Sequence, residues 1–308
     1  MRTISIVIPL YNECESLPAL AESIRTVMEK RAEDWEIIFI DDGSTDNSFT
    51  TLKECRAPFG ERMRLFRFTR NYGKSAALST GIREARGDVI ITMDADLQDD
   101  PAAIPDLLAK LDEGWDLVSG WKKKRYDPLT FTIPSKLWNM VNSMLSGVKL
   151  HDFNCGFKAY RATAAKSLEI YGDRHRYLPP LAHWNGFRVT EIPVPHRRRQ
   201  FGRSKYGFGK FFNGVMDMLT LLFLKRYLRS PLHFFGLLGC GLILLGTGVL
   251  GYFGVRWIVT GDMHIRPLVL LSVSAVIVGI QFLSFGFLAE ILINMAPKDT
   301  YIIREKIE

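Results

Sequence analysis

The clearest evidence for the fold class is one segment near the middle of the soluble part, Val89-Ile90-Ile91-Thr92-Met93-Asp94-Ala95-Asp96-Leu97-Gln98. Its first half is a short apolar and β-branched run, which is typical of a strand buried on both faces. Its second half is an acidic turn that begins where the strand ends. Ligands of open α/β sheets bind beyond the carboxyl ends of the strands. The stretch therefore predicts a buried strand that delivers two carboxylates to a ligand site.

Four more short β-rich runs lie around this strand, at residues 4–8, 36–40, 64–68 and 116–119. Helical patterns separate them. Apolar residues repeat at helical spacing from Leu17 to Met28, behind Ser16 as a candidate N-cap. The Ala-rich segment from Lys74 to Arg86 ends at a glycine, the usual C-terminal stop of a helix. This alternation predicts a parallel α/β sheet with crossover helices over residues 1 to about 125.

Polar clusters also follow the first two predicted strands. They are Pro9-Leu10-Tyr11-Asn12-Glu13 and Asp41-Asp42-Gly43-Ser44. One such cluster alone would indicate a turn, because Asp, Asn, Gly and Ser favour turns. Three clusters that converge on one edge of a sheet, with the acidic stretch as the third, indicate a ligand site.

Asp94 and Asp96 can face one point if the backbone turns between them. They would then give hard oxygen ligands to Mg²⁺ or Mn²⁺, which would bridge a diphosphate, and Gln98 could add another oxygen. The alternative is an acidic loop with a helix cap, because Asp99-Asp100-Pro101 has the composition of a helix start. The crowding of acids where a nucleotide would bind favours the metal site.

Two basic runs complement these acids: 122–125 after the fifth strand, and 196–205 further along. The second run combines arginines with Gly and Ser, which suits a loop that grips phosphate. Such runs are also found on solvated faces and on faces toward anionic lipid. Nucleic acid is not predicted as a partner, because the chain has membrane spans and a net charge of only +7.

Two long uncharged runs, Phe234 to Val255 and Pro267 to Ala289, predict transmembrane helices. The alternative is a pair of buried core helices. The short link between the runs makes a hairpin, with basic residues concentrated before the first run and after the second. The positive-inside rule therefore predicts an integral membrane protein with the soluble domain and both termini in the cytoplasm. Small residues, such as Gly236 and Cys240 or Thr247 and Gly251, permit close packing of spans and leave a homo-oligomer open.

Two segments are predicted to be amphipathic helices, at about 134–147 and at 207–230. The second, which adjoins the first span and has a basic fringe, is predicted to lie at the membrane interface, whereas for the first the interface and the domain core are equally open. The alternative for the second is packing on the domain core. The predicted organisation is a soluble domain over 1–206, an interfacial helix over 207–230, a transmembrane hairpin over 231–296 and a cytoplasmic tail over 297–308.

The composition averaged over the whole chain describes neither the soluble domain nor the transmembrane hairpin. The 308 residues are 47% hydrophobic and 24% charged, which excludes a disordered, collagen-like or disulfide-scaffold chain. Nearly all of the charge lies before Pro231. The four cysteines form no CxxC pair, so neither a zinc site nor a disulfide framework is predicted.

In combination, these motifs resemble the family 2 glycosyltransferases, and most closely the polyprenyl-phosphate glycosyltransferases, which include dolichol-phosphate mannose synthases and bactoprenol glucosyltransferases. Three further motifs and the hairpin extend the resemblance over essentially the whole chain. These motifs are Arg70-Asn71-Tyr72-Gly73-Lys74, Asp152-Phe153-Asn154-Cys155-Gly156-Phe157-Lys158-Ala159-Tyr160-Arg161 and Arg199-Gln200-Phe201-Gly202-Arg203-Ser204-Lys205.

The resemblance implies a GT-A (Rossmann-like) fold, a nucleotide-sugar donor, a polyprenyl phosphate acceptor and Mg²⁺ or Mn²⁺. It also implies roles for individual residues, with Asp41 reading the nucleobase. One departure is Cys155, where relatives often have Ser or Thr, and this puts the acceptor-side assignment in question. The implied residues are Pro9, Tyr11, Glu13, Asp41, Lys74, Asp94 and Asp96 for the donor; Asp94, Asp96 and Gln98 for the metal; Arg125, Arg199, Ser204 and Lys205 for phosphate and acceptor; and Asp96, Asp152 and Arg199 for catalysis.

The expected reaction is direct attack of a lipid phosphate oxygen on the anomeric carbon of a hexose, with inversion and release of nucleoside diphosphate. UDP-glucose-like and GDP-mannose-like donors are both open, with a UDP-hexose slightly favoured. A processive polysaccharide synthase is rejected because Arg256-Trp257 lacks the Gln of the Gln-x-x-Arg-Trp motif. The remaining alternative is a non-catalytic nucleotide-sugar-binding scaffold or a component of a lipid-linked sugar translocase.

Overall fold

The structure is a computed structural model that describes residues 2–123, 139–140, 142–144, 146–168, 170, 174–196, 231–261 and 267–295. The chain forms two compact units, residues 1–218 and 219–308, and each is described by itself. The interfacial helix predicted at 207–230, the tail at 297–308 and the domain limit at 206 lie outside the described residues, so they stay predictions.

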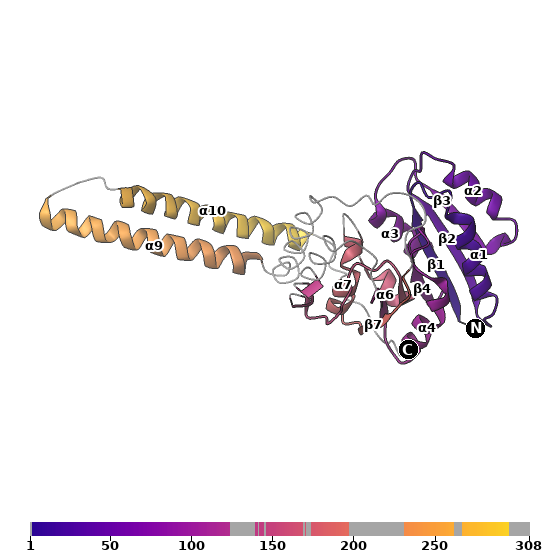
Figure 1. Ribbon diagram of the computed structural model, residues 1–308. Helices are drawn as coiled ribbons and strands as arrows, with labels where there is room; N and C mark the ends of the chain where they lie inside the picture. The colour runs from indigo at the N-terminus through magenta and orange to yellow at the C-terminus, as the bar shows by residue number, and fades with distance from the viewer. Residues whose placement is uncertain are drawn as a thin grey trace. The chain divides into compact units, whose positions relative to one another are not determined.

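The N-terminal unit is built on a seven-stranded sheet with the order β3-β2-β1-β4-β6-β5-β7 (Figure 1). All five runs predicted as strands are confirmed. The strands are β1 (Thr3–Leu10), β2 (Asp34–Asp41), β3 (Met63–Arg67), β4 (Val89–Thr92), β5 (Leu117–Trp121), β6 (Lys158–Arg161) and β7 (Val189–Pro193).

The strands predicted within residues 1 to about 125, β1 to β5, all run in one direction, as predicted, and the sheet as a whole is mixed because of β6. β1 to β4 are parallel to one another, but β6 runs antiparallel to both β4 and β5 and separates them. The turn that contains Asp152 and Asn154 lies beside the acidic stretch at the carboxyl edge of the sheet, so β6 starts from that edge and runs in the opposite direction.

Helices cover both faces of the sheet. Along β1, Ile4, Ile6 and Ile8 pack in the cluster that contains the apolar faces of α1 and α4, whereas Val7 packs in the cluster that contains α3. This alternation is what a strand buried on both faces requires. The helices are α1 (Leu17–Met28), α2 (Ser48–Cys55), α3 (Lys74–Glu84), α4 (Ile104–Asp112), α6 (Ala162–Lys166) and α7 (Leu178–Trp184), with 3-10 turns η1 (Gly60–Arg62), η2 (Pro101–Ala103) and η3 (Arg174–Arg176).

The predicted helix limits hold with small corrections. Ser16 occupies the N-cap position of α1, but its hydroxyl donates to the carbonyl of Glu13 at 2.9 Å and does not cap the helix. α3 ends at Glu84, before the predicted Arg86. Asp100 accepts a hydrogen bond from the backbone N–H of Ala102, so it caps the turn at Pro101, as the helix-start pattern indicated.

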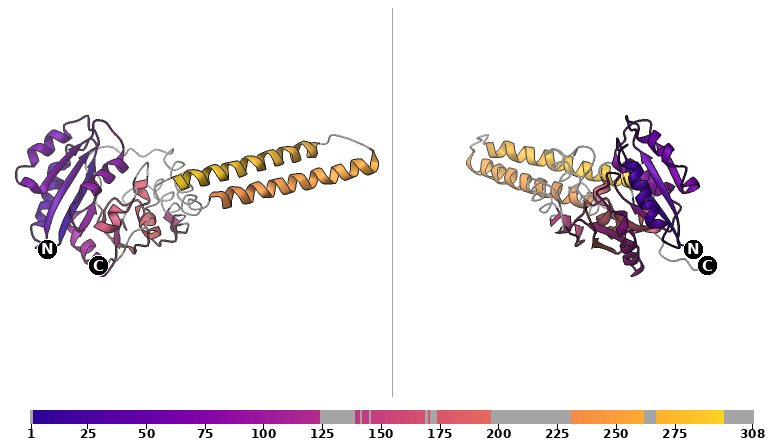
Figure 2. Two further views of the ribbon diagram at one scale, coloured as in Figure 1. Left: turned by 180° about the vertical axis from the view of Figure 1, so that it is seen from behind. Right: turned by 45° about the vertical axis from the view of Figure 1, so that its right-hand side comes forward.

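The C-terminal unit consists of two long helices, α9 (Pro231–Thr260) and α10 (Pro267–Met295), that lie side by side (Figure 2). Both are long and apolar enough to cross a membrane. They approach closely at glycines: a Cβ at Gly239 would lie 2.7 Å from the carbonyl oxygen of Gly279, and one at Gly246 would lie 2.7 Å from that of Ser272. The small residue Gly251, in contrast, has nothing within 4 Å.

Candidate active site

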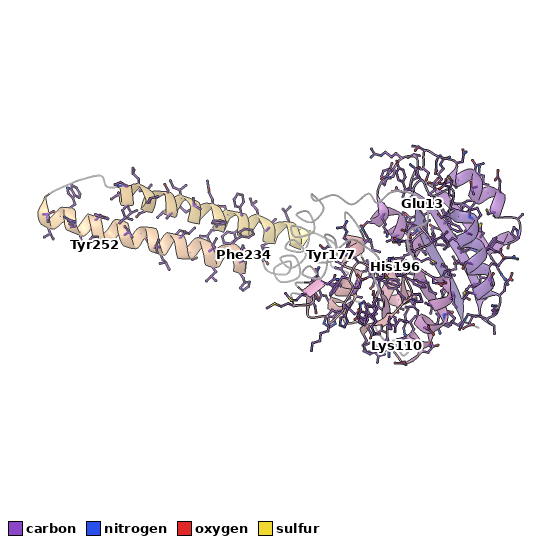
Figure 3. The ribbon with its side chains drawn as sticks, in the orientation of Figure 1. Glu13, Lys110, Tyr177, His196, Phe234 and Tyr252 are labelled. Carbon is purple, nitrogen blue, oxygen red and sulfur yellow. The ribbon has the colours of Figure 1, made fainter. Side chains whose placement is uncertain are left out.

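The polar clusters that follow β1 and β2 bind each other. Asn12 adopts a left-handed backbone conformation with φ of 56°. Its backbone N–H donates to Ser44 Oγ at 2.9 Å, and its side-chain Oδ1 accepts from the N–H of Thr45 at 2.9 Å. The N–H of Glu13 likewise donates to Ser48 Oγ at 2.9 Å. These bonds bring the predicted donor residues of the two clusters to one edge of the sheet (Figure 3).

Asp41 and Asp42 have different partners. The fully buried Asp41 accepts from the N–H of Ser44 at 2.8 Å and forms an ion pair with Arg67, whose Nε lies 3.2 Å from Oδ2. Asp42 accepts from the N–H groups of Tyr72 and Gly73 at 2.7 and 2.9 Å, and burial raises the pKa of its carboxyl. Asp42 therefore fixes the turn that leads into α3. The sequence did not predict Arg67 as a site residue.

Lys74, the first residue of α3, forms an ion pair with Asp94, with Nζ and Oδ1 2.5 Å apart. The pKa of Asp94 lies well below its usual range: burial alone would raise it, but the ammonium groups of Lys74 and Lys122 outweigh burial. Asp96 is also buried, and its Oδ1 accepts from the N–H of Gln98 at 3.2 Å. The turn from Asp96 to Gln98 places Leu97 in the left-handed backbone region, with φ of 59°.

Two lysines lie around these acids: Lys158 is buried and Lys122 is partly buried. Lys122 pairs with the buried Asp99, with Nζ 3.2 Å from Oδ1. Although burial opposes the charged form of Lys122, the facing acids, Asp99 foremost, raise its pKa. Lys158 on β6 donates to the carbonyl oxygen of Cys155, and burial lowers its pKa. Sequence reasoning missed Asp99, Lys122 and Lys158 as individual site residues, because charged residues in runs and at strand ends are normally solvated.

Asp152, which is predicted to border the acceptor, is almost fully buried. Its Oδ1 accepts from the N–H of Asn154 at 3.1 Å, which shapes the turn into β6. Cys155 follows in the same turn, and burial raises the pKa of its thiol to about 12. The carbonyl of Gly156 accepts from the hydroxyl of Thr92 at 2.8 Å, so this turn is tied to β4 directly below the acidic stretch.

The second basic run begins at the same place. His196 forms an isolated antiparallel bridge with Asp99, and it is labelled in Figure 3. The predicted phosphate-binding residues Arg125, Arg199, Ser204 and Lys205 lie outside the described residues. Their roles therefore stay predictions.

Asp94 and Asp96 fit a divalent cation that is shared with a ligand. In the part of the chain that the structure describes, no group of three His, Cys, Asp or Glu side chains forms a complete metal cage. Mg²⁺ and Mn²⁺ do not need one, because they commonly use one or two carboxylates and take the remaining oxygens from phosphates and water. The side-chain amide of Gln98 follows in the same turn.

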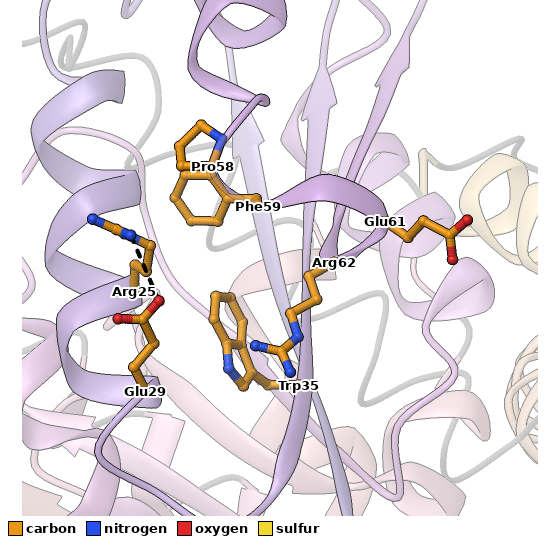
Figure 4. A pocket seen from close by; sticks show the side chains of 7 residues that line it. All are labelled: Arg25, Glu29, Trp35, Pro58, Phe59, Glu61 and Arg62. Carbon is orange, nitrogen blue, oxygen red and sulfur yellow. Dashed lines mark ion pairs between the residues drawn. The ribbon is translucent and has the colours of Figure 1, made fainter.

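A separate hollow of about 400 Å³ lies away from this edge (Figure 4). It includes Trp35, near the start of β2, whereas Asp41 ends that strand. None of the predicted site residues lines it. The lining residues are Arg25, Glu29, Trp35, Pro58, Phe59, Glu61 and Arg62.

Fold and site together define a sugar-nucleotide transferase of the GT-A class. Residues 5–168 match the domain described as glycosyl transferase family 2, and the chain belongs to this family. The chain is 36% identical to dodecaprenyl-phosphate galacturonate synthase of Rhizobium johnstonii, over 98% of this chain and 92% of that protein. It is 35% identical to undecaprenyl-phosphate 4-deoxy-4-formamido-L-arabinose transferase of Salmonella choleraesuis, over 94% of this chain and 88% of that protein.

Solved structures confirm the GT-A fold. Glucosyl-3-phosphoglycerate synthase of Mycobacterium tuberculosis, in complex with Mn²⁺ and UDP-glucose, aligns with a TM-score of 0.56 over 72% of this chain and 79% of that one, at 20% identity. Its complex with Mn²⁺, UDP and phosphoglyceric acid aligns with a TM-score of 0.58, over 72% and 78% of the two chains, also at 20% identity.

Proposed function

We propose that this protein transfers a sugar from a nucleoside diphosphate sugar to a polyprenyl phosphate, with inversion at the anomeric carbon. The observation that carries the proposal is the acidic pair Asp94 and Asp96 at the carboxyl edge of the sheet, joined to Lys74 by a 2.5 Å ion pair. The relatives that match nearly the whole chain are polyprenyl-phosphate sugar transferases by name, which supports the same acceptor class.

On the donor side, Asp94, Asp96 and Gln98 would hold Mg²⁺ or Mn²⁺. The ion supplies positive charge that stabilises the departing diphosphate. Lys74 adds a positive group at the same place, since its ammonium already contacts Asp94. Asp41, held by Ser44 and Arg67, would recognise the nucleobase. Pro9, Tyr11 and Glu13 would line the base pocket.

On the acceptor side, the attacking group needs little activation. The second pKa of a phosphate monoester is about 6, so its oxygen is largely ionised at neutral pH. The task of the protein is to hold two anions in line. Asp152 would orient the acceptor or the sugar, and Arg125, Arg199, Ser204 and Lys205 would bind phosphate.

The segment at 139–146 supports placement of the acceptor side against lipid. Its polar residues Asn139, Asn142 and Ser146 are buried, whereas Met140 and Met144 are 63% and 86% exposed. A helix in water has the opposite distribution. This part of the helix predicted at 134–147 would lie at the membrane interface, with the catalytic domain and both termini in the cytoplasm and α9 and α10 as the anchor.

The proposal is tested with the full-length protein in detergent, a short polyprenyl phosphate and a panel of donors that includes UDP-glucose, a UDP-uronic acid and GDP-mannose. Release of nucleoside diphosphate should require both the lipid phosphate and Mg²⁺ or Mn²⁺, and one donor should exceed the others. A UDP-hexose is the expected donor. Binding of nucleotide sugar without transfer from any donor would instead favour the scaffold or translocase component.

A further inference from the structure

His151 is held in a fixed orientation on the acceptor side of the site. Its imidazole stacks on the indole of Trp121, with ring centroids 4.2 Å apart and planes at 17°. Nδ1 is hydrogen-bonded to Glu191 Oε1, and the backbone N–H of His151 donates to Glu191 Oε2 at 2.9 Å. One ring face and one ring nitrogen are thus fixed by side chains from β5 and β7.

The two members of this pair differ in exposure. The side chain of Glu191 is only 11% exposed, whereas that of His151 is 68% exposed. Glu191 therefore holds the ring from the Nδ1 side through a charge-assisted hydrogen bond. Within the described ranges, Nε2 of His151 makes no hydrogen bond, so it is available to a ligand. The ammonium of Lys123, 5.8 Å from the centroid of the Trp121 ring, adds a second positive group beside the stack.

The position of the stack points to the acceptor. His151 immediately precedes Asp152, and its carbonyl oxygen accepts from the side-chain amide of Asn139 at 2.8 Å. Asn139 belongs to the segment that exposes Met140 and Met144. The hydrogen bond between Asn139 and His151 therefore places an imidazole with an available nitrogen next to a segment with an exposed apolar surface. A polyprenyl phosphate combines the same two chemistries, an anionic head and an apolar chain.

We propose that His151, as an imidazolium held by Glu191 and Trp121, binds an oxygen of the acceptor's phosphate monoester and so sets the affinity for the acceptor. The inference rests on the proposed transfer to polyprenyl phosphate. Among the described residues, the charged groups nearest to this stack are Glu191 from β7, which contacts the ring, Lys123 after β5, which lies over Trp121, and Asp152, the next residue of the turn. A charge-assisted hydrogen bond of this kind contributes about tenfold or more to binding.

The test measures steady-state kinetics of the full-length protein with varied acceptor and saturating donor, at about pH 6 and about pH 8.5, on either side of imidazole titration. His151→Gln should raise the KM for the acceptor about tenfold at the lower pH and leave the KM for the donor unchanged. His151→Arg, which keeps a permanent charge that can stack on Trp121, should retain the low acceptor KM at both values. Glu191→Gln, which removes the carboxylate that holds the ring, should also raise the KM for the acceptor.

His183→Gln is the matched control, because His183 is an exposed histidine of α7 without a carboxylate partner among the described residues. If His151→Gln leaves the acceptor KM unchanged, or raises the donor and acceptor KM values equally, His151 has only a structural role and the inference is wrong. Absence of transfer by the wild-type protein would instead refute the proposed function.

Two further measurements identify the source of the phosphate. Inorganic phosphate should compete with the acceptor in the wild-type protein and compete less in His151→Gln. Binding to phosphatidylcholine vesicles should depend on His151 only when they contain polyprenyl phosphate. An equal loss with vesicles that contain phosphatidylglycerol and no acceptor would assign His151 to general lipid headgroups and overturn the inference.

Discussion

Gly156 lies directly against the carboxylate of Asp94: a Cβ at position 156 would be 2.4 Å from Asp94 Oδ1 and 2.7 Å from Oδ2. The turn that leads into β6 and the acidic turn after β4 therefore share one packed surface. The hydrogen bond from the Thr92 hydroxyl to the carbonyl of Gly156 holds that surface together. The position of Asp94 thus depends on a glycine far away in the sequence.

Gly156→Ala should reduce transferase activity about 100-fold or more, because the added methyl group must displace the carboxylate of Asp94. The loss should appear mainly in kcat at saturating substrates. Gly248→Ala is the control, since nothing lies within 4 Å of a Cβ at that position. Full activity of Gly156→Ala would show that Asp94 can move without consequence.

Asp94→Asn should lower kcat by about 100-fold and weaken the response to added Mn²⁺, because an amide is a poorer ligand than a carboxylate and the change removes the ion pair between Asp94 and Lys74. Chelation of divalent cations should likewise abolish activity in the wild-type protein, and Mg²⁺ or Mn²⁺ should restore it. Asp106→Asn, on the exposed side of α4, should behave like wild type. Wild-type activity of Asp94→Asn would refute the metal assignment.

Cys155 should not react with alkylating reagents in the folded protein at pH 8. Burial raises the pKa of its thiol to about 12, so only about one molecule in 10⁴ carries the reactive thiolate, and the sulfur is shielded from the reagent. Mass spectrometry after labelling should find Cys155 unmodified until the protein is denatured. Cys155→Ser should retain more than about half of the activity, since the thiol has a packing role. A large loss would give the sulfur a part in the reaction.

His175 should make the stability of the N-terminal unit depend on pH. Burial and the nearby Lys74 and Arg176 lower its pKa to about 3, and Nδ1 lies 2.9 Å from Ser75 Oγ. Because the folded state binds this proton less readily than the unfolded state, the contribution to stability is present above pH 6.5 and is lost as the pH falls toward 3. The free energy of unfolding decreases by up to about 1.4 kcal/mol per pH unit over this range.

Denaturation of the full-length protein and of His175→Gln between about pH 4.5 and pH 7 checks this expectation. The variant should lose stability less steeply on acidification than the wild type. Asp94, whose pKa is lowered, loses its contribution mainly below its ordinary pKa of 3.8, so this pH range separates its effect from that of His175. If the free energy of unfolding falls equally steeply with pH in both proteins, a group other than His175 causes the pH dependence.

The parts of the fold that the sequence predicted are those set by local pattern. β1, β2 and β4 are continuous apolar runs, and α1 repeats its apolar residues at helical spacing. β6 was missed because Lys158 and Arg161 flank only two less polar residues, and Lys158 is charged yet buried. Its place in the sheet depends on pairing with β4 and β5, which no local pattern contains.

The site shows the same division. The acidic stretch could be predicted because its residues and its position after a strand are both local. The pairing of Lys122 with Asp99 and of His151 with Glu191 could not, since Glu191 lies 40 residues from His151 and on another strand. Such partners are brought together only by the order of the strands.

The exposed methionines at 140 and 144 have a practical consequence for work on the catalytic domain. They belong to the N-terminal unit and not to the hairpin. On the proposed interfacial placement of this segment, removal of α9 and α10 should leave a protein that still adheres to detergent and lipid surfaces, and fractionation alone would misassign where its attachment resides.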